Sequence, residues 1–167
     1  LLSKLRKGDI VVLSGSLPKG SPVNTYGTWV NACKKAGAKV ILDADGELLA
    51  NGMQASPYLI KPNNHELSAL MGETLKTPDA LKKAARSLMQ KYDIDRIVVS
   101  MGGAGALYLT EHETIYAEGL KVPVKSTVGA GDSVVAALAA AEESGKSLAD
   151  AVRLSAACGA ANVMCSG

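Results

Sequence analysis

The chain reads Ser126-Thr127-Val128-Gly129-Ala130-Gly131-Asp132-Ser133 at the start of a long run of small apolar residues. The glycines allow a tight turn that presents bare backbone N–H groups, and the positive end of a following helix attracts the same anion. Asp132 lies in the first turn of that helix. A carboxylate beside an anion site makes sense if it takes a proton from a hydroxyl that attacks a bound phosphoryl group. The alternative is that Asp132 caps the helix and the glycines only make a tight turn.

Outward from this turn, short β-branched runs alternate with helical segments that carry clear start and stop signals. Strands are expected at 10–13, 39–43, 58–61 and 96–100, with two or three more between 106 and 124. Helices are expected at 25–36, 46–53, 63–71, 77–92, 130–144 and 148–163. Four strand–helix repeats imply an α/β fold, with a mostly parallel sheet, right-handed crossovers and helices on both faces.

Polar loops follow the predicted strands at the ends where such sheets bind ligands. These loops are residues 14–16, 43–45, 61–63 and 100–105. One edge of the sheet should therefore carry a continuous polar site.

Length and composition limit the protein classes. A chain of 167 residues without linker or repeat is expected to be a single domain, residues 1–167. The balance of 18 basic and 16 acidic residues leaves no footprint for nucleic acid or an acidic membrane. The apolar runs are too short to span a bilayer. Three cysteines without C-x-x-C spacing favour a reduced, cytoplasmic protein.

Four motifs occur in order along the chain. They are SGSLPKG at 14–20, KPNNHEL at 61–67, SMGGAGA at 100–106 and TVGAGDS at 127–133. Together they resemble the PfkB carbohydrate kinases, and most closely the phosphosugar branch with 1-phosphofructokinase and tagatose-6-phosphate kinase. The resemblance implies a ribokinase-like three-layer αβα sandwich. That fold would be incomplete, because the N-terminal half and the β lid of the family have no counterpart in the sequence.

The resemblance assigns roles at the glycine turn. Asp132 is expected to deprotonate the attacking hydroxyl, and the amides of Gly129, Ala130 and Gly131 to form the anion hole for the transferring phosphoryl group. Lys61 is expected to meet an ATP phosphate, although a strand-end lysine in solvent is the alternative.

Asn63 and Glu66 match the Asn-x-x-Glu motif of the family, which arranges Mg²⁺ and phosphate oxygens through water. The same two residues have capping-box spacing, which is independent of any metal. The two roles are compatible.

Two further loops receive binding roles from the resemblance. Backbone groups of the loop at 100–105 are expected to hold the nucleotide, and the residues concerned are Ser100, Gly102, Gly103 and Gly105. The alternative is an ordinary hairpin-like loop. Ser14, Gly15 and Ser16 are expected to bind a sugar hydroxyl or the phosphate already on the sugar, with a polar turn as the alternative. Asp43 and Asp45 follow the neighbouring strand, but a solvated strand end explains them equally well.

The sequence therefore predicts a kinase that uses ATP and Mg²⁺ to phosphorylate a phosphohexose, first of all fructose 1-phosphate to fructose 1,6-bisphosphate. Tagatose 6-phosphate, or another small molecule used by a kinase of this fold, is the alternative substrate. A different class of alternative is an inactive nucleotide-binding fragment, since the sugar-holding half of the family has no counterpart here. The expected partners are the phosphosugar and ATP, with no nucleic acid or membrane and with a homodimer of the full-length protein.

Overall fold

A computed structural model of the chain describes residues 2–166. Within them a six-stranded sheet has the order β1-β2-β3-β4-β5-β6. The strands are β1 (Ile10–Ser14), β2 (Lys39–Asp43), β3 (Leu59–Ile60), β4 (Arg96–Ser100), β5 (Ala106–Thr110) and β6 (Thr114–Ala117). β1 to β4 pair in parallel, whereas β4–β5 and β5–β6 are antiparallel. The predicted α/β fold with a mostly parallel sheet is confirmed, and residues 106–124 contribute two strands.

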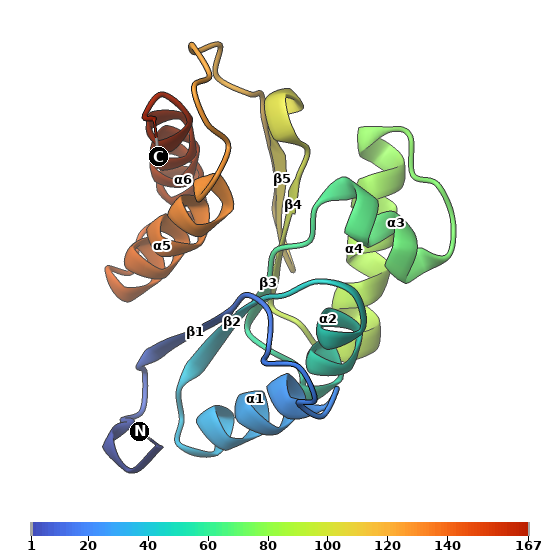
Figure 1. The fold of residues 1–167 in the computed structure, drawn as a ribbon, viewed down its shortest axis with the longest axis vertical. Helices are drawn as coiled ribbons and strands as arrows, with labels where there is room; N and C mark the ends of the chain where they lie inside the picture. Colours follow the sequence, from blue (N-terminus) through green and yellow to red (C-terminus); the bar gives the residue numbers. More distant parts are fainter. Residues whose placement is uncertain (1, 167) are drawn as a thin grey trace.

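Helices cover both faces of the sheet, as expected. They are α1 (Thr25–Lys35), α2 (Gly46–Gly52), α3 (Asn64–Met71), α4 (Pro78–Tyr92), α5 (Ala130–Glu143) and α6 (Leu148–Val163). Figure 1 shows α1 to α4 on one side of the twisted sheet and α5 with α6 on the other. The predicted start of α4 is confirmed: Thr77 accepts from the amide of Ala80, with Pro78 in the first turn. None of the helices within residues 2–166 has the length and hydropathy that a membrane span requires.

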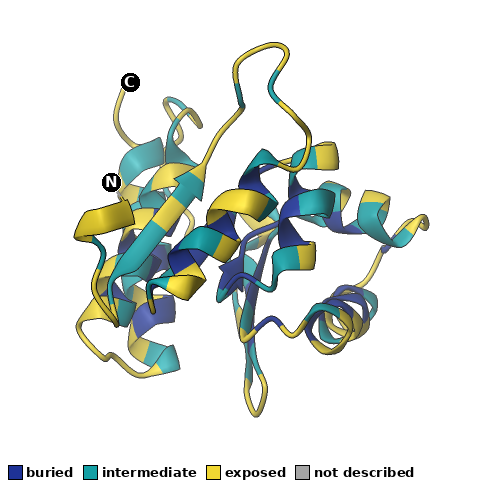
Figure 2. Ribbon diagram, turned by 90° about the horizontal axis from the view of Figure 1, so that it is seen from below, coloured by how far each residue is buried: buried dark blue, intermediate teal, exposed yellow. Residues whose placement is uncertain are grey.

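Alternating side chains of the strands enter separate hydrophobic clusters on the two faces of the sheet. Leu42 packs among α1 to α4, whereas its neighbour Ile41 packs against α5 and α6. In β4, Ile97 and Val99 belong to the first core and Val98 to the second. Because both faces are covered, these strands are apolar throughout rather than alternating with polar residues. Figure 2 shows the buried residues concentrated in the strands and on the inner faces of the helices.

A charged cluster ties α5 to the sheet at the edge opposite the polar loops. The side chain of Glu142 is only 10% exposed and forms ion pairs with Lys39 and, at 3.0 Å, with Arg96. Both cations also lie over the ring of Tyr58. Burial alone would raise the pKa of Glu142, but Lys39, the nearby hydroxyl of Tyr58 and Arg96 outweigh it and hold that pKa below its usual value.

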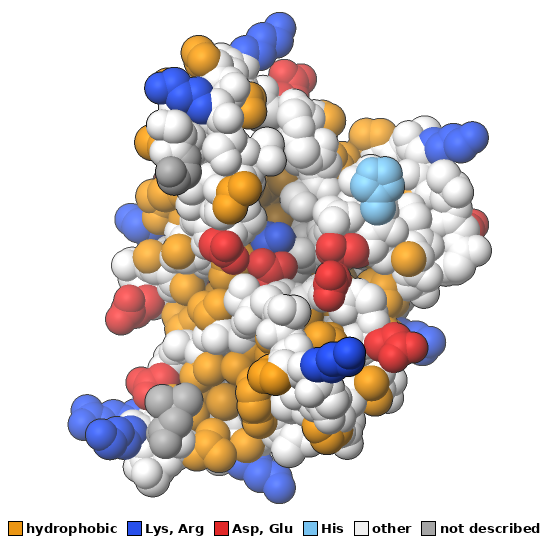
Figure 3. All heavy atoms as spheres, viewed as in Figure 1, with side chains coloured by type: hydrophobic (Ala, Val, Ile, Leu, Met, Phe, Trp, Pro, Cys, Tyr) orange, Lys and Arg blue, Asp and Glu red, His pale blue; other side chains and the backbone are white. Residues whose placement is uncertain are grey.

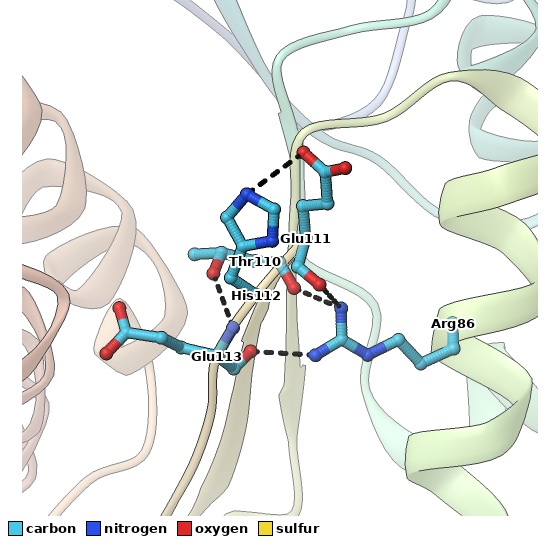
Figure 4. A network of polar contacts seen from close by, with 5 residues as sticks. All are labelled: Arg86, Thr110, Glu111, His112 and Glu113. Carbon is cyan, nitrogen blue, oxygen red and sulfur yellow. Dashed lines mark hydrogen bonds and ion pairs between the residues drawn. The ribbon is translucent and has the colours of Figure 1, made fainter.

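Arg86 of α4 anchors the β5–β6 hairpin. Its guanidinium donates to the carbonyl groups of Thr110, Glu111 and Glu113 (Figure 4). It also donates, at 2.9 Å, to Oγ1 of Thr114. A planar guanidinium with five N–H donors suits such a row of backbone acceptors. The hairpin is therefore fixed to the helical layer next to it.

Candidate active site

The polar loops meet at one edge of the sheet, as the sequence predicted. Ser14 lies opposite Asp43 in the β1–β2 pair, and the amide of Gly15 donates to the carbonyl of Asp43 at 3.0 Å. Further along, Asn63 bridges to Ser100. Figure 3 shows this face hollowed near its centre, with acidic groups gathered around a basic one. The ends of β1 to β4 thus form one continuous polar edge.

Lys61 lies at the centre of this edge and is buried. Its Nζ is 3.1 Å from Oδ1 of Asp43, and the two side chains are 10% and 18% exposed. A Cβ placed on Gly131 would lie 3.5 Å from the same Nζ. The alternative of a strand-end lysine in solvent is therefore wrong. The ammonium group lies beside the glycine turn, with a carboxylate on the neighbouring strand as its partner.

The glycine turn leaves backbone donors free. Gly129 has a left-handed φ of 77° and precedes α5, and the amide of Ala130 donates to Thr127 at a long 3.3 Å. The amides of Gly131 and Asp132 donate to no acceptor within residues 2–166. First-turn amides have no partner inside their own helix, and here they stand at the positive end of a 14-residue helix. The turn and the Lys61 ammonium together can bind a phosphoryl group. The amide of Asp132 was not among the predicted donors.

The carboxylate of Asp132 is exposed and accepts no hydrogen bond from the part of the chain that the structure describes. Asp150 occupies the same position in α6, three residues after the N-cap Ser147, and its carboxylate is engaged by Ser147 at 2.7 Å and Arg153 at 2.9 Å. The capping alternative for Asp132 is therefore wrong. Asp132, whose carboxylate is free, is the next residue in the chain after Gly131.

Asn63 and Glu66 form the capping box that their spacing indicates. The Asn63 side chain accepts from the amides of His65 and Glu66 at 2.9 and 2.8 Å. Both carboxylate oxygens of Glu66 accept from Asn63, at 2.8 Å from its amide and 2.7 Å from its side chain. No group of three or more ligating side chains that could hold a metal occurs among residues 2–166. Mg²⁺ bound through water needs only one or two carboxylates beside substrate phosphates, so such a site does not require a group of this kind.

A cavity of about 340 Å³ opens beside the turn, between the sheet and α6. Lys61 and Gly131 lie at its polar end together with Ser100, so the structure brings these predicted residues to one place. The remaining walls are mainly apolar and include Val98, Ala106, Leu120, Val122, Ala156 and Val163. A volume of this order is typical of a small-molecule site with an apolar body and a few polar groups.

The glycines of the loop at 100–105 differ in what the structure requires of them. Gly102 and Gly103 face open space beside the cavity. A Cβ on Gly105 would lie 2.0 Å from the carbonyl oxygen of Ala117, and one on Gly119 would lie 2.1 Å from that of Gly103. Gly105 and Gly119 therefore let two backbone segments touch, whereas Gly102 and Gly103 leave a surface that a ligand can approach.

Several residues of the site were not predicted from the sequence. Asp43 was left without a role, and Gly119 and Asn162 were not singled out. Asn162 places its Nδ2 3.4 Å from a Cβ position on Gly129, and its Oδ1 is buried with no partner within residues 2–166. A lone amide in an alanine-rich helix was the only available signal for Asn162.

Comparisons with known proteins show the family of the chain. The family model described as pfkB family carbohydrate kinase matches residues 1–167. The chain is 38% identical over 157 residues to a 1-phosphofructokinase of Bacillus subtilis, covering 94% of this chain and 52% of that protein. The chain thus spans about half the length of the curated relatives it matches.

Solved structures show the same fold. Phosphofructokinase-2 from Escherichia coli in complex with fructose-6-phosphate matches with a TM-score of 0.91 and 35% identity, covering 98% of this chain and 54% of that one. Arabidopsis thaliana ribokinase complexed with ribose and ATP matches with a TM-score of 0.78 and 29% identity, covering 95% of this chain and 50% of that one. The fold is ribokinase-like, and the chain belongs to the pfkB family of carbohydrate kinases.

Proposed function

We propose that the chain is the nucleotide-binding and catalytic part of an ATP-dependent kinase that phosphorylates a hydroxyl of a phosphohexose, fructose 1-phosphate first of all. One observation carries the proposal. Within residues 2–166, the free amide of Gly131 and the buried ammonium of Lys61 lie at one end of one cavity, and Asp132, the next residue of α5, carries a carboxylate without a partner. Phosphoryl transfer needs this combination of anion binding and a proton acceptor.

In the proposed complex, ATP lies along the cavity with its phosphates toward the glycine turn. The apolar walls receive the base, and the open faces of Gly102 and Gly103 border the phosphates or ribose. Lys61 and the amides of Gly131 and Asp132 hold the transferring group. Asn63, Glu66 and Asp43 would hold Mg²⁺ through water, and the ion neutralises phosphate charge when it is bound.

Asp132 then acts as the base. It accepts the proton of the sugar hydroxyl as that oxygen attacks the γ-phosphorus in line, and the leaving ADP keeps the former bridging oxygen. The alignment of the two substrates supplies most of the rate, because the protein performs little covalent work.

A substrate panel tests the proposal. The complete reading frame that carries these residues is incubated with ATP, Mg²⁺ and fructose 1-phosphate, fructose 6-phosphate, tagatose 6-phosphate or fructose, and ADP release is measured. The expected result is a kcat/KM for one of the three phosphosugars at least about tenfold above that for fructose. Equal or faster turnover of the unphosphorylated sugar contradicts the proposed substrate class.

The same assay distinguishes the proposed kinase from the alternative of an inactive nucleotide-binding module. The 167-residue chain alone is expected to bind ATP without phosphorylating sugar, because the chain spans about half of its relatives. Specific sugar phosphorylation by this chain alone would overturn that expectation. A homodimer of the complete protein and a cytoplasmic location remain predictions.

A further inference from the structure

Tyr26 of α1 lies directly beneath the loop at 14–16. Its side chain is 2% exposed, and its hydroxyl lies 3.0 Å from the carbonyl oxygen of Ser14 and 2.9 Å from that of Gly15. Burial, and then the carboxylates of Asp43 and Asp45, raise the pKa of Tyr26, so the hydroxyl keeps its proton and acts as a donor. Two consecutive carbonyl groups of an exposed loop are thus directed at one buried hydroxyl.

This contact sets the direction of the next amide. The chain has no cis peptide bond within the described residues, and in a trans peptide the C=O and N–H groups point in opposite directions. Because the carbonyl of Gly15 is directed at Tyr26, the N–H of Ser16 points away from α1. That N–H donates to no acceptor within residues 2–166, and Ser16 is exposed.

The backbone of Gly15 is left-handed, a conformation that glycine adopts without steric cost and can also leave. Its φ is 91°, and a Cβ placed there would meet nothing within 4 Å. Crowding therefore does not hold this conformation. The Tyr26 hydroxyl on one side, and the bond from the Gly15 amide to the carbonyl of Asp43 on the other, fix the peptide. Asp43 is also the partner of Lys61, so the end of β2 lies between the loop and the anion-binding centre.

We propose that Tyr26 is a positioning residue for the phosphosugar: it fixes the Gly15–Ser16 peptide so that the free N–H of Ser16 donates to the phosphate that the sugar already carries. The serine hydroxyls of the loop supply further donors. This inference rests on the proposed function, because it takes a phosphosugar as the acceptor substrate. Tyr26 itself does not touch the substrate, since its hydroxyl is buried under the loop.

The variant Tyr26→Phe removes the hydroxyl and keeps the buried ring. In the complete protein we expect the phosphosugar KM to rise about three- to tenfold, the effect of one lost hydrogen bond, while kcat and the ATP KM stay within about twofold. Tyr58→Phe is the matched control, because it removes a tyrosine hydroxyl at the opposite edge of the sheet. All its constants should stay within about twofold. A phosphosugar KM for Tyr26→Phe within about twofold of wild type overturns the inference.

Failure of the proposed function is visible separately, as a wild-type protein that phosphorylates no phosphosugar. The role of Tyr26 is then decided by amide hydrogen–deuterium exchange over residues 14–17 of the complete protein. Faster exchange of this segment in Tyr26→Phe, with unchanged exchange in Tyr58→Phe, supports the positioning role. Equal exchange in Tyr26→Phe and wild type overturns it.

Discussion

The Nζ of Lys61 lies 3.1 Å from Oδ1 of Asp43, and this pair links the ends of two neighbouring strands beside the glycine turn. Asp43→Asn would leave a nearly buried ammonium without its anion. We therefore expect the free energy of unfolding to fall by about 3–5 kcal/mol, as for other buried pairs that lose one partner. Urea unfolding at pH 7 measures it. Asp45→Asn is the control, because that exposed carboxylate has no ion pair within residues 2–166, and equal losses in both variants would contradict the account.

The two glycines of the glycine turn should respond differently to replacement by alanine. Gly129 has a φ of 77°, and its new Cβ would lie 3.4 Å from Nδ2 of Asn162. Gly129→Ala should therefore lower the free energy of unfolding by about 1–2 kcal/mol. Gly131→Ala should cost less than about 0.5 kcal/mol, because its Cβ meets only the end of Lys61 at 3.5 Å.

The same methyl group on Gly131 would occupy space where the account places the transferring phosphoryl group. Gly131→Ala is therefore expected to lower kcat by about 10²-fold with nearly normal stability. Steady-state kinetics and thermal unfolding of the same preparations measure both effects. Normal turnover by Gly131→Ala would contradict the placement of the transferring phosphoryl group at this turn.

Gly105 and Gly103 form a second pair for comparison. A Cβ on Gly105 would lie 2.0 Å from a backbone oxygen, which a side-chain movement cannot relieve, whereas Gly103 has nothing within 4 Å. Gly105→Ala should reduce the free energy of unfolding by about 3 kcal/mol or more, and Gly103→Ala by less than about 1 kcal/mol. Urea unfolding curves of the two variants decide this. Equal stability of the two would show that the loop is not packed against residues 117–119.

Glu142 should make the free energy of unfolding depend on pH. Burial is the largest single effect and raises the pKa of Glu142. Lys39, the Tyr58 hydroxyl and Arg96 together outweigh burial and hold this pKa below its usual value in the folded protein. A carboxylate of this kind stabilises the fold above its unfolded pKa of about 4.3 and loses that contribution as the pH falls through the lower folded value. Glu142→Gln should therefore cost about 1–3 kcal/mol at pH 7 and progressively less below about pH 4. A difference that does not change between these pH values would contradict the assignment.

Much of the architecture was predictable because local signals and burial agree. The apolar runs around Ile41 and Val98 predicted strands covered on both faces, and Thr77 with Pro78 marked the start of α4. The antiparallel direction of β5 was anticipated only by the alternative of a hairpin-like loop at 100–105, and that of β6 was not predicted, because a short apolar run does not reveal its pairing.

The site was predicted in its motifs but not in its supporting contacts. In the sequence, an aspartate that pairs with a buried lysine looks the same as an aspartate at a solvated strand end. Only the position of Lys61 on the next strand shows that Asp43 is of the first kind. Tyr26 supports a loop that lies 11 or 12 residues earlier in the chain, so no spacing rule connects the two. Asn162 reaches Gly129 from another helix. Such contacts depend on tertiary packing, which a single sequence does not display.

The most direct test of the account is the turnover of Asp132→Asn beside that of Asp150→Asn in the complete protein. Both carboxylates lie in the first turn of a helix, but within residues 2–166 only that of Asp150 accepts hydrogen bonds from neighbouring side chains. The account predicts that Asp132→Asn lowers kcat by about 10²–10⁴-fold while the KM for ATP changes by less than about threefold, and that Asp150→Asn keeps nearly normal kcat. A kcat of Asp132→Asn close to that of wild type would contradict the role of Asp132 as the catalytic base.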